Sequence, residues 1–125
     1  MSIVDHVNIP VANLERSKRF YELALAPLGY RLLMTDGRAI GFGVTNWNFG
    51  IVETPGPFPS IHIAFTASRS EEVARFYESA VGAGGKSNGE PGARPRYGAG
   101  YFAAFVLDPD GHNVEAVFRE TPHPA

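Results

Sequence analysis

Two stretches of the chain place apolar residues at the spacing of an amphipathic helix, and both carry helix start signals. Asn13 is a suitable N-cap for the first stretch, which predicts a helix over about residues 13–27. Ser68 and Glu71 have the spacing of a capping box before the second stretch, which ends at Gly82. The apolar positions are Leu14, Phe20, Tyr21, Ala24 and Leu28 in the first stretch and Val73, Phe76, Tyr77, Ala80 and Val81 in the second.

Shorter runs rich in apolar and β-branched residues predict strands around these helices. One such run precedes each helix, and three follow each helix. Each half of the chain is therefore predicted to fold as strand, helix and three further strands. The runs are residues 5–9, 30–34, 39–44 and 48–54 in the first half and 61–65, 85–88, 101–107 and 113–118 in the second.

The two halves also share sequence, which indicates an internal duplication. Arg-Phe-Tyr-Glu occurs at 19–22 and again at 75–78. Thirteen residues before each arginine stands a histidine inside a strand-like segment, His6 in the first half and His62 in the second. Four matching residues arise easily by chance, but a matching histidine at the same spacing does not. The repeat predicts an α+β fold made of two paired βαβββ modules.

Proline marks the boundary between the modules. Residues 55–60 hold three prolines and read as a stiff linker. We expect module 1 over about 3–54, module 2 over about 61–119, and one domain over 1–125, because 125 residues suffice for a single core.

Composition excludes several classes of protein. A hydrophobic fraction of 44% with 19% charged residues is typical of a globular chain. The net charge of -2 gives no electrostatic basis for binding nucleic acid. No apolar run is long enough to cross a membrane, and the amino terminus has no signal-like stretch, so we expect a cytoplasmic protein. Because the chain has no cysteine, any metal must be held by nitrogen and oxygen.

Strand alternation places three candidate metal ligands on corresponding faces. His6 and His62 occupy equivalent positions of the two modules, and Glu115 interrupts an apolar pattern in the last strand. A single strand histidine or glutamate usually has an ordinary hydrogen-bonding role. The symmetric combination instead favours a site with two histidines and a carboxylate, suited to Zn, Ni, Fe, Mn or Co.

Three further acidic or histidine positions enter the prediction. Glu53 ends module 1 much as Glu115 ends module 2, so we expect it near the position equivalent to Glu115, as a fourth ligand or a base. His112 lies in a turn and His123 in the proline-flanked tail. We expect both of these histidines to be solvent-facing residues without a role in the site.

A glycine-rich segment and several aromatic residues are candidates for substrate binding. Residues 89–100 contain Arg94, Arg96 and Tyr97, and they predict a lid over an anionic or aromatic substrate, with a plain solvated loop as the alternative. Aromatic residues at strand spacing line either a pocket or the core. These residues are Trp47, Phe49, Tyr101, Phe102 and Phe105.

Three motifs together resemble the vicinal oxygen chelate superfamily, the group of glyoxalases, bleomycin resistance proteins and ring-cleaving dioxygenases. They are Asp-His-Val at 5–7, the two Arg-Phe-Tyr-Glu helices, and Asp-Pro-Asp-Gly-His-Asn-Val-Glu at 108–115. The resemblance covers residues 3 to about 119. It implies a curled sheet around a metal and substrate cleft, a divalent ion at His6, His62 and Glu115 with Glu53 as the further acid, and a homodimer.

The resemblance leaves three functions open. The first is a metal-dependent lyase or isomerase, in which the ion chelates adjacent oxygens of a small molecule and Glu53 or Glu115 moves the proton. The second is a binding protein of the bleomycin-resistance kind without catalysis. The third is an Fe(II) extradiol dioxygenase, for which neither His112 nor His123 is well placed as the acid-base group.

Overall fold

Two copies of a β-α-β-β-β unit follow one another in a computed structural model that describes residues 3–121. This arrangement confirms the α+β fold of two modules predicted from the repeat. Module 1 contains β1 (Val7–Val11), α1 (Leu14–Leu25), the single 3-10 turn η1 (Ala26–Leu28), β2 (Arg31–Asp36), β3 (Ala39–Gly43) and β4 (Trp47–Glu53). Module 2 contains β5 (His62–Thr66), α2 (Ser70–Gly82), β6 (Lys86–Ala93), η2 (Pro95–Tyr97), β7 (Tyr101–Leu107) and β8 (Asn113–Arg119).

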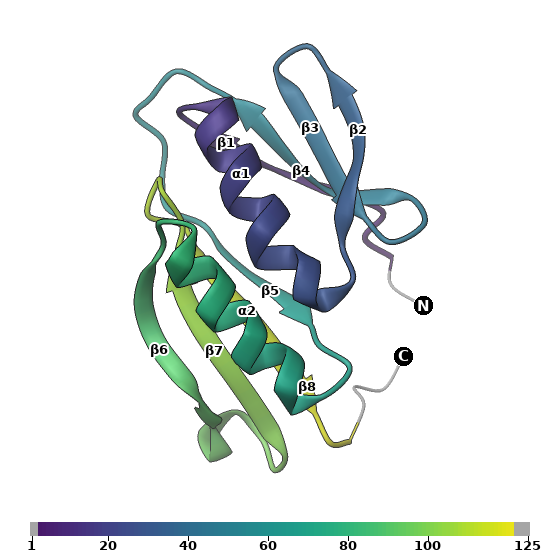
Figure 1. The fold of residues 1–125 in the computed structure, drawn as a ribbon, viewed down its shortest axis with the longest axis vertical. Helices are drawn as coiled ribbons and strands as arrows, with labels where there is room; N and C mark the ends of the chain where they lie inside the picture. The colour runs from purple at the N-terminus through teal and green to yellow at the C-terminus, as the bar shows by residue number, and fades with distance from the viewer. Residues whose placement is uncertain (1–2, 122–125) are drawn as a thin grey trace.

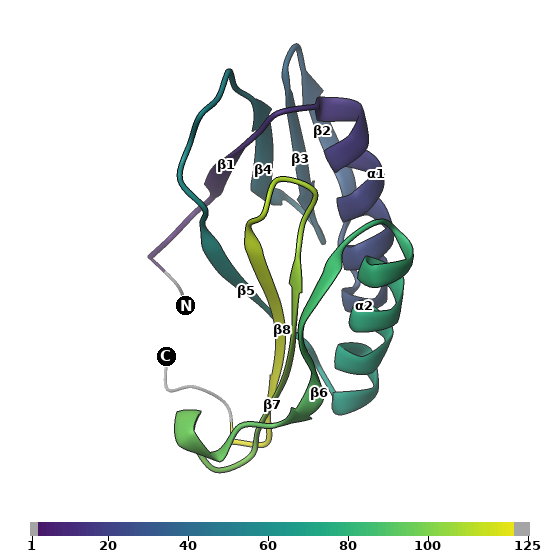
Figure 2. The same ribbon diagram turned by 90° about the vertical axis from the view of Figure 1, so that its left-hand side faces the viewer.

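Each module forms one four-stranded mixed sheet, in the order β1-β4-β3-β2 or β5-β8-β7-β6. The first strand of each module runs parallel to the last, and the other neighbours are antiparallel. Both α-helices lie on the same side of the two sheets, and in the described part of the chain the other side carries no α-helix, only the short 3-10 turn η2 (Figures 1 and 2). We call this side without an α-helix the open face. In the described part of the chain, no strand ladder joins β1 to β5.

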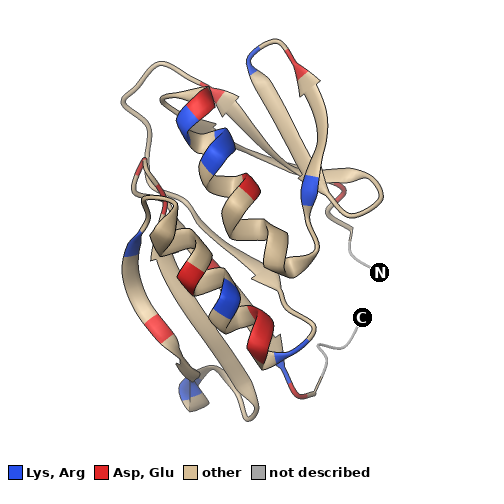
Figure 3. Cartoon of the chain, viewed as in Figure 1, with Lys and Arg blue, Asp and Glu red and all other residues tan. Residues whose placement is uncertain are grey.

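One hydrophobic core runs through both modules on the helix side. Helices α1 and α2 lie against each other, and their apolar stripes cover the inward-facing residues of the sheets (Figure 1). Phe49 of module 1 meets Phe65 of module 2 edge to face, with ring centroids 5.0 Å apart. The outward faces of both helices carry charges of both signs (Figure 3). The two modules therefore share their interior and form one domain.

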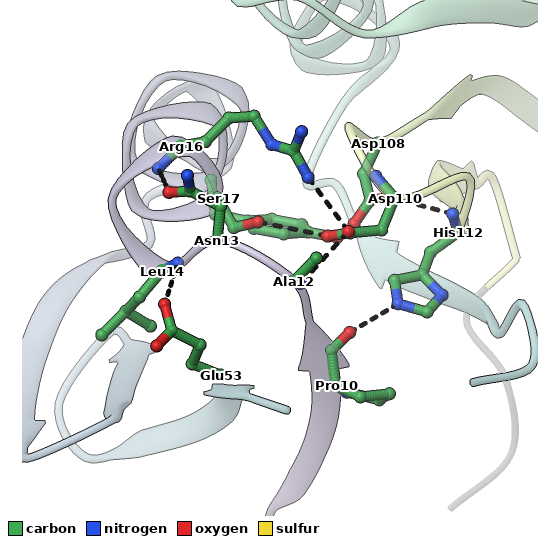
Figure 4. Close-up of polar contacts among 11 residues, drawn as sticks. Pro10, Ala12, Asn13, Leu14, Arg16, Ser17, Glu53, Asp108, Asp110 and His112 are labelled. Atoms are coloured by element: carbon green, nitrogen blue, oxygen red, sulfur yellow. Dashed lines mark hydrogen bonds and ion pairs between the residues drawn. The ribbon is translucent and has the colours of Figure 1, made fainter. Parts of the chain in front are cut away.

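The turn between β7 and β8 also joins the modules, and we call residues 108–112 the clasp. Tyr21 of α1 donates its buried hydroxyl to Asp108 Oδ2 at 2.5 Å. Asp110 Oδ1 accepts from the backbone N–H of Ala12 at 3.1 Å and from the Arg16 guanidinium at 3.0 Å (Figure 4). These contacts fasten the second module to the start of α1 in the first.

His112 completes the clasp and is fully buried, so the prediction of a solvent-facing residue is wrong. Its Nδ1 accepts the N–H of Ile61 at 3.0 Å, and its Nε2 lies 2.7 Å from the carbonyl oxygen of Pro10 (Figure 4). Because Nδ1 is an acceptor, Nε2 carries the proton and donates to Pro10. The ring also stacks on Phe58 of the linker at 5.7 Å. His123 lies outside the described residues.

Local boundaries differ from the sequence prediction in several places, and β1 begins at Val7, so His6 lies just before the strand. Helix α2 has Arg69 at its N-cap, and Glu72 rather than Glu71 accepts the N–H of Ser68. The expected lid is partly strand, because β6 extends through Ala93 and pairs with β7. Within residues 3–121, no helix is both long enough and apolar enough to span a membrane.

Candidate functional site

A buried carboxylate lies on the open face of module 2. Glu115 is only 2% exposed, whereas its neighbours Val114 and Ala116 point into the core on the helix side. The register pairs Glu115 with Ala64 of β5 and with Phe105 of β7. The predicted alternation is therefore confirmed, and Glu115 shares its face with side chains from both neighbouring strands.

Two side chains satisfy this carboxylate. His62 Nε2 lies 2.8 Å from Glu115 Oε1, and Tyr101 donates its hydroxyl to Glu115 Oε2. A carboxylate only accepts hydrogen bonds, so His62 carries a proton on Nε2 in this arrangement. The His62 side chain is 56% exposed, which leaves the imidazole accessible from solvent. Glu115, Tyr101 and His62 thus place a carboxylate, a hydroxyl donor and an imidazole ring at the base of one pocket.

The pocket has a volume of about 480 Å³. Aromatic rings form much of its wall, and a guanidinium closes one side, with Arg119 Cζ 4.8 Å from the Tyr101 ring centroid. Such a mixture of apolar walls and a few convergent polar groups is typical of a small-molecule site. Its lining residues are His62, Tyr97, Tyr101, Phe105, Glu115 and Arg119.

Burial and the neighbouring Glu115 raise the pKa of Tyr101 from 10.0 to about 12. Folding therefore favours the neutral phenol. The resulting stabilisation is fully present below pH 10 and is lost as the pH rises from 10 toward 12. We expect Tyr101→Phe to flatten the fall in the free energy of unfolding across this range, measured by urea denaturation at several pH values. If the free energy of unfolding of Tyr101→Phe fell as steeply with pH as that of the parent, the raised pKa of Tyr101 would be contradicted.

His6 lies on the open face of module 1 rather than beside His62. Its Nδ1 is 2.9 Å from Asp5 Oδ2, and its ring centroid is 4.7 Å from that of Trp47. The indole lies over two glycines of the sheet, because a Cβ at Gly41 would be 2.8 Å from Trp47 Cγ and one at Gly50 3.3 Å from Cζ3. His6 and Trp47 line a second pocket of about 650 Å³.

Module 1 has no acid at the position equivalent to Glu115. The repeat makes Asn8 the counterpart of Ala64, since each lies two residues after the repeated histidine. Ala64 pairs with Glu115, and Asn8 pairs with Gly50. The counterpart of Glu115 is therefore Gly50, and a Cβ there would be 2.0 Å from Asn8 Oδ1. The Asn8 amide occupies the space that a side chain would need.

Glu53 instead faces the helix side, so the expectation that it lies near the equivalent of Glu115 is wrong. It pairs with Val11, three positions beyond the Asn8–Gly50 pair, and an odd shift along a strand reverses the face. Its Oε1 accepts the N–H of Leu14 at 2.9 Å, at the first turn of α1 (Figure 4). A carboxylate at a helix N-terminus stabilises the unpaired N–H groups there.

We expect Glu53→Ala to lower the free energy of unfolding by about 1 kcal/mol, the usual effect of losing a helix cap. Glu53→Gln is the matched control, because its amide oxygen can still accept from Leu14. Urea denaturation measures both. Bound metal, measured by elemental analysis, should be unchanged in Glu53→Gln, and its loss there would make Glu53 a ligand after all.

The structure thus brings together two of the four predicted ligands, His62 and Glu115. Within residues 3–121 of one chain, no group of three His, Cys, Asp or Glu side chains is arranged to hold an ion. The donors His62 Nε2 and Glu115 Oε1 are nitrogen and oxygen, which suit divalent transition metals. One chain thus supplies two of the donors that a three-ligand metal site would need.

The predicted substrate residues divide between two sides of the sheet. Arg94, Arg96 and Tyr97 line a pocket of about 350 Å³ next to the Glu115 pocket. Phe102 packs against the core on the helix side, so it does not face either of these pockets. Arg119 and the bond from Tyr101 to Glu115 are not among the residues and contacts predicted from the sequence. Strand alternation in β7 and β8 was the available signal, because it places all three side chains on one face.

Comparison with known proteins agrees with this architecture. The model of the Glyoxalase/Bleomycin resistance protein/Dioxygenase superfamily matches residues 3–116. A glyoxalase/bleomycin resistance protein from Albidiferax ferrireducens T118 is 28% identical, with a TM-score of 0.83 over 94% of this chain and 100% of that chain. A search of curated proteins finds no match.

Two more distant solved structures share the fold. A glyoxalase-related enzyme from Fulvimarina pelagi is 23% identical, with a TM-score of 0.76 over 100% of this chain and 94% of that one. A lactoylglutathione lyase from Agrobacterium tumefaciens is 16% identical, with a TM-score of 0.69 over 94% of each chain. The family model spans nearly the whole duplicated unit that was derived from the repeat. This chain belongs to the glyoxalase/bleomycin resistance protein/dioxygenase superfamily.

Proposed function

We propose that this protein is a metal-dependent enzyme of the glyoxalase type, a lyase or isomerase that acts on a small molecule. The observation that carries the proposal is the 2.8 Å contact between His62 Nε2 and Glu115 Oε1 at the base of an open pocket. A buried carboxylate hydrogen-bonded to an accessible imidazole is a common mark of a functional site. Binding of an ion there would displace the proton on His62 Nε2.

His6 is the proposed third ligand, supplied by a second copy of the chain. It stands at the position of module 1 that corresponds to His62, and it lies beside Trp47, whose indole covers Gly41 and Gly50 of the sheet. Within one chain it contacts Asp5 and Trp47, away from the His62–Glu115 pair. In a homodimer whose open faces meet, His6 of one copy would approach His62 and Glu115 of the other. We expect such a dimer in the cytoplasm.

The bound ion would act as a Lewis acid on adjacent oxygens of the substrate. Side chains of this chain would carry the remaining roles. We assign proton transfer to and from the substrate to Glu115, because Glu53 is bound at the N-terminus of α1. Tyr101 remains a phenol at neutral pH and fixes Glu115 Oε2, which leaves Oε1 on the His62 side. Phe105 and Tyr101 exclude water from one wall of the pocket.

Elemental analysis of protein purified without chelator tests the metal. We expect close to one ion per chain, and less than about a tenth of an equivalent after reconstitution would contradict the proposal.

Mixing chains tests whether the metal site is shared between two copies. His6→Gln and Glu115→Gln chains are each expected to lose metal, yet a mixed dimer of the two regains one intact site. A site within one chain would not be restored by mixing.

A binding protein without catalysis is the second candidate, and module 1 provides the observation that favours it. Gly50 replaces the acid there, and Trp47 presents a broad aromatic surface over Gly41 and Gly50. Such a surface suits a flat or cationic compound. Calorimetry with aromatic antibiotics distinguishes the two functions, because a sequestering protein binds them without added metal and a metal-strict site does not.

An Fe(II) extradiol dioxygenase is less well supported. That chemistry needs a further histidine free to exchange protons near the ion. His112 is buried in the clasp with both ring nitrogens engaged, by Ile61 and by Pro10. It therefore cannot take that role.

A further inference from the structure

Three arginines surround the pocket that holds the His62–Glu115 pair. Arg119 follows Glu115 by four residues on β8 and lies in the same pocket. Arg94 and Arg96, before and within η2, line the adjoining pocket of about 350 Å³. Tyr97 and Phe105 line both pockets, so the two hollows share a wall. Positive charge therefore gathers at one place on a chain whose net charge is -2.

None of these three guanidinium groups has a carboxylate partner among residues 3–121. The nearest hydrogen-bonding groups of Arg94 are the carbonyl oxygens of Glu90 and Ala93. Arg96 reaches only the Tyr97 hydroxyl, at 3.1 Å. The contrast is Arg16, which is bound to Asp110 in the clasp. The three charges beside the pocket are thus left without a compensating anion.

Aromatic rings hold these guanidinium groups in place. Arg94 Cζ is 5.5 Å from the Phe105 ring centroid, and Arg96 Cζ is 4.9 Å from that of Tyr97. Arg119 Cζ is 4.8 Å from the centroid of Tyr101. Stacking on a ring orients a guanidinium, and a guanidinium has five N–H donors, so Arg94 and Arg96 keep donors for a ligand beyond the bonds they already make. Each arginine is therefore positioned before any ligand arrives.

The backbone of β6 makes room for Arg94. A Cβ at Gly89 would lie 3.2 Å from Arg94 Nη2, and one at Gly92 would lie 3.1 Å from Nη1. A side chain at either position would push the guanidinium from the Phe105 ring. Gly89 and Gly92 thus leave room for the Arg94 guanidinium beside the Phe105 ring on the open face.

We propose that Arg94, Arg96 and Arg119 form a binding site for an anionic group of the substrate, a carboxylate or a phosphate monoester. Guanidinium forks match both groups in a bidentate manner. The carbon part of the same molecule lies against Phe105 and Tyr97, and its reactive end reaches His62 and Glu115. This inference rests on the proposed function only in taking His62 and Glu115 as the neighbouring reaction site. Binding of the anion itself needs no metal.

Calorimetry on the full chain, without added metal, tests this site with benzoate, phenyl phosphate and the neutral benzamide. We expect at least one of the two anions to bind about tenfold more tightly than benzamide, the effect of one charge-assisted hydrogen bond. The preferred anion identifies the group. Arg96→Gln and Arg119→Gln should each weaken that anion about tenfold and leave benzamide unchanged. Arg94→Lys keeps the charge but loses the fork, so it should weaken the anion less than Arg119→Gln.

Arg38→Gln is the matched control, because this exposed arginine lies in the turn between β2 and β3 of module 1. It removes the same charge far from the pocket. Equal binding of benzamide and both anions, or equal losses in Arg38→Gln and Arg96→Gln, would overturn the anion site. Anion binding in a protein that takes up no metal would overturn the proposed function alone. Metal binding without a preference for anions would overturn this inference alone.

Discussion

Replacing His112 with alanine should lower the free energy of unfolding by about 3 kcal/mol, more than the other substitutions that we propose. The imidazole is fully buried, and its removal leaves a cavity against Phe58. It also leaves the Pro10 carbonyl and the Ile61 N–H without their partners. Both losses fall where module 1, module 2 and the linker meet.

Urea denaturation of the metal-free protein measures this effect, and His6→Ala is the matched control. The His6 side chain is 45% exposed, so its loss should change the free energy of unfolding by less than about 0.5 kcal/mol. Equal stability of the two alanine variants would show that His112 does not fasten the modules together.

Glu115→Gln should abolish metal binding, with a loss of affinity of about a hundredfold or more. The amide has the shape of the carboxylate: its oxygen can still accept from the Tyr101 hydroxyl, and its NH2 group can donate to Nε2 of a neutral His62 ring, so the fold should be retained. Glu115→Ala should in addition lower the free energy of unfolding by about 2 kcal/mol, because it leaves the Tyr101 hydroxyl unpaired in a buried place. The two variants separate the role of the charge from that of the packing.

Metal titration followed by competition with a chelator measures the affinity. Glu90→Gln is the control, since Glu90 is an exposed acid on β6 of the same sheet. It should bind metal as the parent does. Full metal affinity in Glu115→Gln, with native stability, would remove Glu115 from the metal site.

The fold followed from the sequence because the duplication repeats its signals. Each Arg-Phe-Tyr-Glu helix is preceded by one strand and followed by three, so an ambiguous run in one module was supported by its counterpart in the other. The boundaries that moved lie where tertiary pairing decides the outcome. β6 extends to Ala93 because β7 offers a partner, although its glycines and proline would not suggest a strand.

The site was only partly predictable, because register decides which side of a sheet a residue occupies. Glu53 and Glu115 both stand near the end of a module, but only the pairing of β1 with β4 shows that Gly50 is the equivalent position. His112 was misjudged for another reason. A turn residue is usually exposed, and nothing local in the sequence shows that this turn inserts between the modules. Arg119 and Tyr101 were accessible to the alternation argument and were overlooked.

The position of Trp47 has a practical consequence. It is the single tryptophan of the chain, and its indole lies beside His6 and over two glycines. The tryptophan fluorescence of the protein therefore has one emitter with one set of surroundings. Binding of an ion, a compound or a second copy of the chain at His6 changes that emission. Binding confined to the arginine-lined pocket leaves the emission unchanged. The protein thus carries its own fluorescent reporter for the part of the open face that belongs to module 1.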